Sequence, residues 1–291
     1  MKEFIKDVLA NIVYVLYRFG IIRNPLQVAS IDETLEELIH TGKSIVRFGD
    51  SDIVMMCGRT TIVQESAPEL SGKLKKILHY DEEGLMVGIP DIFGDLSQYS
   101  ARSRKFWKKH LLSFRSVYEK QCNTEKIYYN AFLSRMYYNY QNKENCGRWL
   151  EKFKQVWKDR KIVFVEGAGT HNGVGNDLFD GAESIERIIC PPYNAFYVYG
   201  DIVEACRKMP KDRLFLISLG STAKVLTAEL YEEGYRVIDI GNLDMEYEWY
   251  LRKASDKPKI EKHSVTGRQA NEEAGYGDYL NQIIAWIELK E

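Results

Sequence analysis

The sequence predicts an α/β fold with a Rossmann-like, mostly parallel sheet that carries helices on both of its faces. Apolar, β-branched runs of strand length alternate with segments of helical periodicity along the 291 residues. The links between them are short, which favours right-handed strand–helix–strand crossovers and hence parallel strands. Polar residues follow directly after the predicted strands, at the edge of a parallel sheet where ligands bind. The same pattern therefore predicts the fold class and the position of a binding edge.

Local signals define the individual elements. Ser30 and Glu33 fit a capping box, so we expect a helix to begin there and to run to about His40. The other predicted helices cover residues 68–79, 101–120, 143–157, 195–209 and 221–233. The predicted strands are apolar runs at 43–49, 85–89, 126–133, 161–165, 187–190, 214–219 and 236–240. The polar segment 252–279 is expected to form either a lid over the binding edge or an ordinary surface loop.

Size and composition limit the class of protein. A chain with 45% hydrophobic residues can bury a sizeable core, and we expect one α/β domain in residues 26–291 behind an N-terminal amphipathic helix in residues 1–25. The net charge of -2 and the pI of about 6.3 argue against a nucleic-acid-binding protein. The 5 cysteines are widely spaced without a C-x-x-C motif, which favours reduced thiols in a cytoplasmic protein over disulfides or a zinc site.

Residues 4–22 are rich in apolar side chains, with Lys6 and Arg18 among them. The uninterrupted apolar run is too short to span a bilayer, and no small-residue cleavage site follows it, so neither a membrane span nor a secretory signal is expected. Two interpretations stay open: a helix packed on the domain, or an interfacial helix that makes peripheral contact at the inner face of the cell membrane. We favour packing, because the apolar residues cover more than one face of the helix.

The stretch 44–52 carries the most informative local signal. An apolar run ends at Gly49, and the carboxylates of Asp50 and Asp52 follow at once. In an extended chain, residues i and i+2 point to the same side, so the two carboxylates would repel each other unless a cation lay between them. Mg²⁺ and Mn²⁺ prefer oxygen ligands and commonly share their shell with substrate phosphates. We therefore expect a metal-bridged diphosphate here, with a solvated turn as the alternative.

Two glycine-containing turns follow later strands. Glu166 opens a turn that lacks the full G-x-G-x-x-G pattern, so a dinucleotide fingerprint is weakly supported. Gly220, Ser221 and Thr222 lie between a strand and a helix, where backbone N–H groups favour an anion. An ordinary serine N-cap gives the same pattern.

The segments 173–177 and 242–249 add amide, carboxylate and aromatic groups. The first could hold a nucleobase or ribose, or could form a capped turn. The second could complete a metal shell, activate an acceptor hydroxyl or stack on a sugar, or could be an acidic first helical turn. Because all these groups are expected at one end of one sheet, together they suit a nucleotide-sugar diphosphate.

Several blocks of the sequence match one family in the family's order. They are RFGDSD at 47–52, GVGNDLF at 173–179, RIICP at 187–191 with NAF at 194–196, GSTA at 220–223 and DIGNLDMEYEW at 239–249. With these blocks the chain resembles the bacterial glycosyltransferases of the GT-D fold. The resemblance implies transfer of a hexose, glucose or galactose, from a UDP-sugar to a lipid- or protein-linked glycan acceptor. It also implies Mn²⁺ or Mg²⁺ as cofactor and a place in cell-surface polysaccharide or glycoprotein glycan biosynthesis.

Roles for individual residues combine this resemblance with the local chemistry. Asp50 and Asp52 are expected to position the cation, and Asp244 or Glu246 to activate the acceptor hydroxyl if the reaction inverts. The residues expected to bind the nucleotide sugar are Arg47, Gly49, Glu166, Asn176, Asp177, Asn194, Gly220, Ser221 and Thr222.

The chain departs from the family pattern at several positions. Asp52 stands where the family usually has Glu, Thr170-His171 where it has Ser-Arg, and Ser221 where it has Pro. Asn242 stands where the family usually has His, and an amide is a poor metal ligand and no base. These departures keep one alternative open, a catalytically silent nucleotide-sugar-binding subunit of a polysaccharide assembly complex. A second alternative is an NAD(P)-dependent oxidoreductase on a Rossmann-type sheet.

Overall fold

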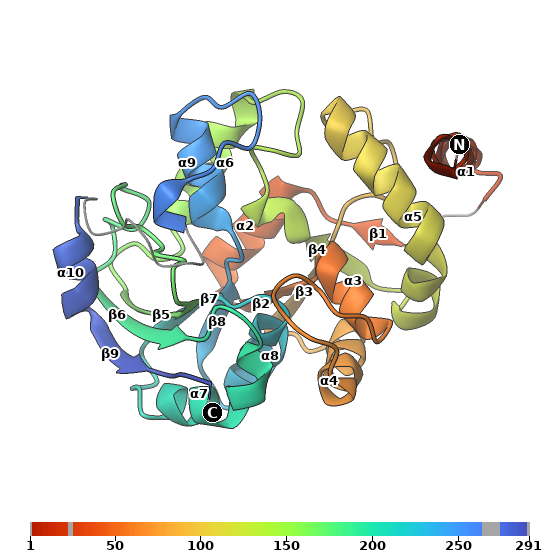
Figure 1. The fold of residues 1–291 in the computed structure, drawn as a ribbon. Coiled ribbons are helices and arrows are strands. Elements are labelled where there is room, and N and C mark those ends of the chain that lie inside the picture. The colour runs from red at the N-terminus through yellow and green to blue at the C-terminus, as the bar shows by residue number, and fades with distance from the viewer. Residues whose placement is uncertain (1, 23–25, 264–273, 290–291) are drawn as a thin grey trace.

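The computed structural model describes residues 2–22, 26–263 and 274–289, and its described strands form one nine-stranded sheet (Figure 1). The strand order is β1-β4-β3-β2-β8-β7-β5-β6-β9. Every pairing between these strands is parallel, which confirms the predicted α/β class and its parallel sheet. Part of the segment predicted as a lid or surface loop, residues 264–273, lies outside the described residues.

The strands lie close to their predicted positions. They are β1 (Gln27–Val28), β2 (Ser44–Arg47), β3 (Leu85–Ile89), β4 (Ile127–Asn130), β5 (Lys161–Gly167), β6 (Ser184–Cys190), β7 (Leu214–Ser218), β8 (Arg236–Asp239) and β9 (Ile283–Trp286). The two edge strands β1 and β9 were not predicted; β1 has only two residues, and β9 is a short apolar run beyond the last predicted strand. The predicted strand 126–133 ends at β4, and a 3₁₀ helix (Ala131–Ser134, η1) replaces its second half.

The helices also follow the predicted pattern, with the capping box of Ser30 and Glu33 confirmed at the start of α2. They are α1 (Lys2–Arg18), α2 (Ile31–Thr41), α3 (Asp50–Met56), α4 (Pro68–Leu78), α5 (Ala101–Gln121), α6 (Glu144–Lys154), α7 (Tyr199–Arg207), α8 (Thr222–Glu232), α9 (Leu243–Leu251) and α10 (Tyr276–Asn281). Short 3₁₀ helices occupy Ala195–Val198 (η2) and Glu261–His263 (η3). The predicted helix 195–209 is therefore η2 followed by α7.

The chain is not extended through the acidic pair. β2 ends at Arg47, Gly49 is the N-cap of α3, and Asp50 is the first residue of that helix. Two helical positions i and i+2 do not face each other, so the premise that both carboxylates project to one side is wrong. The helix starts here because Asp52 accepts a hydrogen bond of 2.7 Å from the backbone N–H of Gly49.

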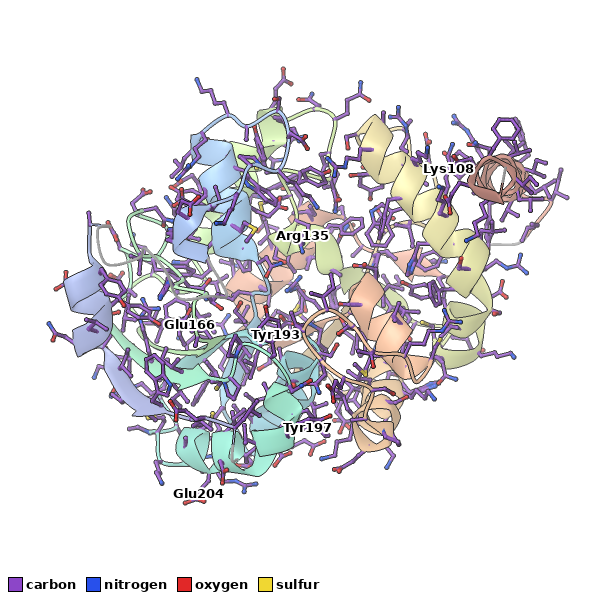
Figure 2. All side chains as sticks on the ribbon, viewed as in Figure 1. Lys108, Arg135, Glu166, Tyr193, Tyr197 and Glu204 are labelled. Carbon is purple, nitrogen blue, oxygen red and sulfur yellow. The ribbon has the colours of Figure 1, made fainter. Side chains whose placement is uncertain are left out.

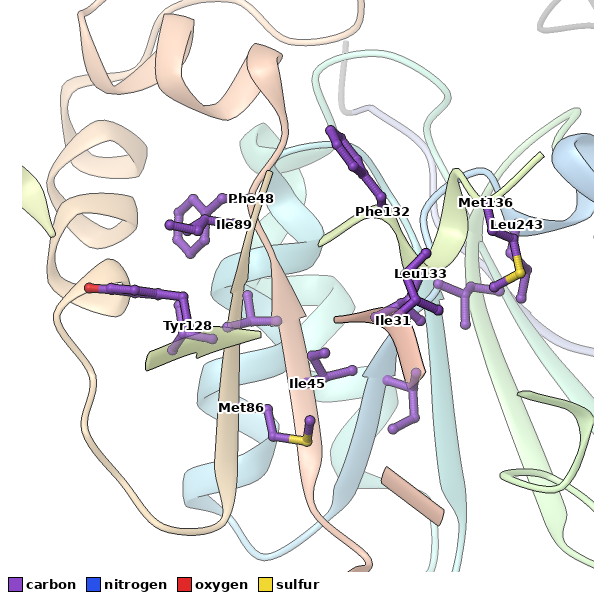
Figure 3. Packing of buried hydrophobic residues seen from close by; sticks show 14 of the residues in the cluster. Ile31, Ile45, Phe48, Met86, Ile89, Tyr128, Phe132, Leu133, Met136 and Leu243 are labelled. Atoms are coloured by element: carbon purple, nitrogen blue, oxygen red, sulfur yellow. The ribbon is translucent and has the colours of Figure 1, made fainter. Parts of the chain in front are cut away.

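Helices cover both faces of the sheet (Figure 1). α4, α7 and α8 pack on one face, and α2, α6 and α9 lie on the other. Figure 3 shows part of the larger core cluster, to which Ile45 on β2, Met86 on β3, and Phe132 and Leu133 of η1 all belong. This buried apolar layer fixes the strand ends, which in turn fix the loops that follow them.

α1 lies at the periphery and packs against α5 (Figure 1). Ala10, Tyr14 and Tyr17 are the side chains of α1 that are buried in this contact. Most of the other apolar side chains of the helix are exposed. The favoured packing interpretation therefore holds for one face of α1 and leaves its other face without a described neighbour. No helix among the described residues is long and apolar enough to cross a bilayer.

Candidate functional site

A cavity of about 660 Å³ opens at the carboxyl ends of the strands. Its walls come from the turns after β2, β5, β6, β7 and β8, from η1 and from the first turns of α5. This is the edge at which ligands bind in open parallel sheets, and β2 and β8, neighbours in the sheet but far apart in sequence, meet there. Among the predicted residues, the cavity is lined by Arg47, Gly49, Asp50, Asp52, Gly220 and Ser221.

Arg47 is a buried brace beneath the cavity floor. Its Nη2 lies 3.0 Å from Oδ1 of Asp239, its Nε donates to the Asp239 carbonyl, and its Nη1 donates to the Ala131 carbonyl at 3.0 Å. Lys224 on α8 lies 3.1 Å from the other carboxylate oxygen of Asp239. Burial alone would raise the pKa of Asp239, but the charges of Arg47 and Lys224 outweigh burial and hold that pKa below its ordinary value.

Gly241 shows how closely Arg47 fits this place. The residue has a φ of +48°, and a Cβ added there would lie 2.2 Å from Nη2 of Arg47. Only glycine allows the chain to turn after β8 while the guanidinium passes under it. Arg47 therefore ties β2, β8 and η1 together, and its contact with a nucleotide sugar stays a prediction.

Asp52 belongs to the same charged group. It is 2% exposed, and one carboxylate oxygen accepts a hydrogen bond of 2.7 Å from the Ser221 hydroxyl. The other oxygen accepts the Gly49 N–H and lies 3.5 Å from Nζ of Lys224. Burial raises the pKa of Asp52 above its ordinary value, although Lys224 opposes this. The structure thus gives Asp52 a bracing role between α3 and α8 and leaves its metal binding a prediction.

Asp50 is in the opposite situation. Its side chain is exposed and lines the cavity, and across the described residues its carboxylate makes no hydrogen bond or ion pair. No group of three histidine, cysteine, aspartate or glutamate side chains in the described part of the chain could hold a metal on its own. A Mg²⁺-type ion needs only one or two carboxylates when substrate phosphates and waters fill the rest of its shell. Asp50 fits such a site.

Cations outnumber carboxylates on the cavity wall. Arg102, Arg135 and Lys257 line the side formed by α5, η1 and the segment after α9, and Figure 2 labels Arg135 there. Tyr138 lies between two of these cations, with Lys257 Nζ 3.8 Å and Arg102 Cζ 5.8 Å from the ring centroid. Arg102 pairs with Asp256, Arg135 lies 3.6 Å from Glu246, and the buried Lys224 lies between Asp52 and Asp239. These side chains offer an anionic ligand several donors on the cavity wall.

The turn before α8 presents main chain to the cavity. Gly220 has a φ of +52° and Ser221 is the N-cap residue, so the first N–H groups of α8 lie at the cavity edge. Thr222 follows as the first helical residue, but it is 1% exposed and is not part of the wall. Of the three residues predicted in this turn, two therefore reach the cavity.

Asn194 does not line the cavity but shapes its rim. It has a positive φ of 55°, and its side-chain oxygen accepts a hydrogen bond of 2.8 Å from the Glu65 N–H. Its own N–H donates to the Val63 carbonyl at 2.9 Å. These bonds fix the loop between α3 and α4, and Val63 and Gln64 of that loop are on the wall. Asp50, Ser221 and the residues beside Asn194 thus share one cavity.

Glu166 is enclosed in the sheet next to the cavity (Figure 2). Its carboxylate lies 2.5 Å from Nη1 of Arg187 on β6 and accepts hydrogen bonds from the backbone and side chain of Asn172. Asn172 lines the cavity, whereas Glu166 does not. The predicted nucleotide contact of Glu166 would therefore act through Asn172.

A second polar cluster lies behind α9, away from the cavity. Asp244 and Glu248 are one turn apart, and Nζ of Lys262 lies 3.2 Å from the first carboxylate and 2.7 Å from the second. Asn176 donates to both, at 2.7 and 2.8 Å. Neither Asn176 nor Asp244 is on the cavity wall; Asn242 and Met245 present the cavity-facing side of this segment. Asp244 and Glu246 thus form the acidic first turn of α9, which was one interpretation of the segment 242–249.

Asp177 and Glu246 are likewise absent from the cavity wall, although Glu246 lies 3.6 Å from Arg135, which does line it. The Tyr247 hydroxyl donates to Asp177 at 2.5 Å, and this bond together with Lys154 lowers the pKa of the carboxyl. Glu246 is buried and accepts the N–H groups of Tyr137 and Tyr138 at 3.0 and 2.8 Å. Burial raises the pKa of Glu246. Its contacts hold the loop that carries Tyr138, and its role as a base stays a prediction.

Several residues on the cavity wall, or buried behind it as Asp239 is, were not predicted from the sequence. The sequence did contain a signal for Asp239, because burying a carboxylate at the end of an apolar strand is costly unless a cation neutralises it. The sequence also contained a signal for Lys224, since a cation in the first turn of a helix interacts unfavourably with the helix dipole. The α5 wall, with Arg102 and Phe106, had none, because its approach to the strand ends depends on the fold.

The comparisons with known proteins agree on one family. The family model described as Glycosyltransferase GT-D fold matches residues 45–268. A solved structure described as "The highly conserved domain of unknown function 1792 has a distinct glycosyltransferase fold" superposes with a TM-score of 0.86 at 36% identity, covering 91% of this chain and 97% of that chain. A second, "A New Glycosyltransferase (DUF1792) from Streptococcus sanguinis", has a TM-score of 0.85 and 39% identity, covering 90% and 100%.

Two curated relatives are longer than this chain. "Probable glycosyl transferase Gly" of Streptococcus gordonii is 40% identical over 264 residues, which are 89% of this chain and 39% of that protein. "Glycosyltransferase GlyD" of Streptococcus pneumoniae serotype 4 (strain ATCC BAA-334 / TIGR4) is 37% identical over 266 residues, which are 90% and 33%. The chain thus spans between a third and two fifths of their lengths. Its resemblance to this family is confirmed by sequence and by fold, and the chain belongs to the glycosyltransferases of the GT-D fold.

Proposed function

We propose that the cavity binds a UDP-sugar and that the protein transfers its hexose, glucose or galactose, to a lipid- or protein-linked glycan acceptor. One observation carries the proposal: a cavity of about 660 Å³ at the carboxyl edge combines the Asp50 carboxylate, which makes no hydrogen bond or ion pair with the described residues, several cationic side chains and a helix N-terminus. Its volume lies in the usual range for small-molecule sites. The names of the relatives support glycosyl transfer, and the donor class is our proposal.

Asp50 is the residue we propose for holding Mn²⁺ or Mg²⁺, with Asp52 behind it as the carboxylate that fixes the start of α3. When bound, such an ion neutralises the diphosphate and stabilises UDP as leaving group. Lys224 and the N–H groups at the start of α8, after the Gly220–Ser221 turn, would stabilise the negative charge of the same diphosphate. Of the wall cations, Lys224 would thus lie where negative charge grows as the sugar–oxygen bond breaks.

The aromatic side of the cavity suits the acceptor. Phe106 is 46% exposed, lies on the wall and can stack against a pyranose ring, as can Tyr138. The nucleotide would then lie toward Gly167, Gly169 and Gly220, where small residues let a base and ribose approach the main chain. The base that activates the acceptor hydroxyl remains open, since Asp244 and Glu246 have other contacts.

Release of UDP from UDP-glucose and UDP-galactose tests the proposal. With Mn²⁺ present we expect slow hydrolysis above the enzyme-free rate, faster turnover with a suitable acceptor, and loss of both with a chelator. Asp50→Asn should lower kcat/KM by at least about tenfold, because the ion loses its protein ligand. Asp212→Asn removes a carboxylate that is 60% exposed at a remote site and serves as the matched control.

The same assay separates the alternatives. UDP binding without turnover over a broad acceptor panel would favour the catalytically silent subunit, for which Asn242 on the cavity wall is the motivating residue. A rise in melting temperature with NAD or NADP but not with UDP would favour the oxidoreductase. Wild-type turnover by Asp50→Asn would show that the metal assignment is wrong.

A further inference from the structure

α1 has two apolar faces, and one of them has no described neighbour. Ala10, Tyr14 and Tyr17 are buried against the domain. The opposite face presents a stripe with helical spacing that continues just past the helix end, each side chain between 41% and 74% exposed: Phe4, Ile5, Val8, Leu9, Ile12, Val15, Phe19 and Ile21. We call these residues the α1 stripe. A contiguous exposed apolar surface of this kind marks an interaction site.

The buried face holds α1 in a fixed orientation. The Tyr14 hydroxyl accepts the Leu96 N–H at 3.0 Å and donates to Asp95 at 3.2 Å. Lys108 of α5 lies 4.3 Å from the centroid of the Tyr14 ring and donates to Asn11 at 2.8 Å (Figure 2). Because these contacts are on the inner side, the α1 stripe is presented outward at the edge of the molecule, beyond α5 (Figure 1).

The surroundings of the α1 stripe are strongly basic. In the sequences of α1 and α5, ten lysine and arginine residues stand against three acidic ones, whereas the whole chain has 40 basic and 42 acidic residues. The acidic residues of α1, Glu3 and Asp7, pair with Lys109 and Lys105 of α5. Lys6 and Arg18 keep 65% and 51% of their side chains exposed on α1 itself, although Lys6 lies 3.8 Å from Glu3 and Arg18 lies 3.5 Å from Asp95.

From this combination we propose that α1 and α5 form a membrane-binding face, which seats the protein on an anionic lipid surface with the α1 stripe at the boundary between headgroups and acyl chains. An apolar stripe flanked by cations is the composition of an interfacial helix. Anionic headgroups attract the flanking basic side chains, each of which adds to the binding. A second copy of this chain is the poorer occupant, because it would bring two surfaces of like positive charge together.

The cavity lies on the side of α5 that faces away from α1. Arg102, Phe106 and Trp107 of α5 line it, while Lys105 and Lys108 of α5 contact α1. A protein seated through α1 and α5 therefore holds one cavity wall close to the lipid surface. If the proposed function is correct, this placement suits an acceptor glycan carried on a lipid; the membrane binding itself does not depend on the donor or the reaction.

Co-sedimentation with vesicles tests the proposal without any sugar nucleotide. We expect the full chain to bind vesicles of phosphatidylcholine containing phosphatidylglycerol, to bind pure phosphatidylcholine weakly, and to be released in part by salt. Leu9→Gln combined with Ile12→Gln should weaken binding by about tenfold or more, since two exposed apolar side chains leave the membrane boundary. Leu280→Gln on α10 is the matched control, because Leu280 is 49% exposed and α10 lies far from α1 (Figure 1).

The possible results distinguish membrane binding by the α1 stripe from contact with a second copy of the chain. Both variants change exposed side chains, and circular dichroism and the melting temperature confirm that each is folded. Failure of the wild-type chain to bind either vesicle, or wild-type binding by the double variant, would overturn the proposal. A wild-type dimer that the double variant converts to monomer, with no vesicle binding, would assign the α1 stripe to a second copy instead. If the wild-type chain bound vesicles but released no UDP from UDP-sugars, the proposed function would be contradicted and this inference would stand.

Discussion

Arg47 illustrates how a single side chain sets the geometry of the site. It pairs with Asp239, which is fully buried, and both residues lie at the two strands that meet in the middle of the sheet. A buried ion pair contributes modest stability, but removal of one partner leaves an uncompensated buried charge. The role of Arg47 is therefore architectural, and its effect on substrate passes through the position of the turns after β2 and β8.

We expect Arg47→Met to lower the free energy of unfolding by roughly 3–5 kcal/mol, because the Asp239 carboxylate then has only Lys224 as a cationic partner. Urea denaturation measures this difference. Arg148→Gln removes an ion pair of Arg148 with Asp32 at the surface and should lower the free energy of unfolding far less. Equal effects of the two substitutions would contradict the bracing role.

The structure brings some of the predicted residues to the cavity and leaves others away from it, and the difference has a physical reason. Asp50 and Ser221 were found because the residue after a parallel strand must lie at the binding edge. Asp244, Asn176 and Asp177 also follow strands, but helical and turn geometry rotates them to the far side of α9. Polarity and position along the chain reveal the edge, whereas the direction of a side chain depends on where the next helix starts.

The segment after α9 shows how one element positions another. Lys257 lines the cavity, and five residues later Lys262 is inserted between Asp244 and Glu248, where it is 2% exposed. Lys262 also donates to the Val174 carbonyl, and its own carbonyl lies 2.6 Å from Nδ1 of His171. The segment is thus fastened to α9 and to the turn after β5, which holds Lys257 at the rim.

We expect Lys262→Met to weaken the attachment of this segment to α9, because two buried carboxylates lose their shared cation. The melting temperature should fall, and under the proposed function KM for the UDP-sugar should rise more than kcat falls, as Lys257 loses its place. Lys259→Met changes a lysine that is 71% exposed and should leave both unchanged. If Lys262→Met lowered kcat alone, Asp244 would be acting on the reaction rather than through this segment.

α5 contains a buried histidine with a consequence for stability. His110 lies 3.1 Å from the Tyr118 hydroxyl, and burial lowers its pKa from 6.5 to about 4. In the unfolded chain the imidazole takes up a proton below pH 6.5, while in the folded chain it stays neutral until about pH 4. The unfolded state therefore binds more protons in this window, and stability falls as the pH is lowered through it.

The expected loss reaches roughly 2–3 kcal/mol by pH 4 for this group. His110→Gln should remove that part of the pH dependence, because glutamine can still bond to Tyr118 and does not titrate. His79→Gln, at an exposed helix end, is the control. Chemical denaturation at several pH values between 4 and 7 measures the difference; parallel curves for wild type and His110→Gln would contradict the assignment.

At the level of elements, long periodic segments were predicted well and short ones were not. The capping box of α2 and the apolar runs of β5 and β7 are determined by residues close in sequence. α3 was missed, because it has only seven residues and a glycine N-cap, and the Ser221 hydroxyl that holds Asp52 in place comes from a distant part of the chain. Such contacts between distant segments are invisible to a local pattern.

At the level of the whole molecule, the parallel sheet and its binding edge followed from the alternation of strands and helices. The strand order did not, because a sequence shows that β2 and β8 are strands and not that they are neighbours. That pairing brings the turn of Asp50 against the turn of Ser221 and closes the cavity. The orientation of α1, with one face buried and the other outward, is likewise a property of the assembled fold.

The central claim is that this cavity holds a diphosphate whose cation is bound by Asp50. A crystal soaked with UDP and Mn²⁺, measured with anomalous scattering, tests it most directly. The account predicts UDP density along the turns of Gly167 and Gly220 and a manganese peak about 2.1–2.2 Å from an Asp50 oxygen. A manganese peak at the Asp244–Glu248 cluster, or UDP bound outside the cavity, would contradict it.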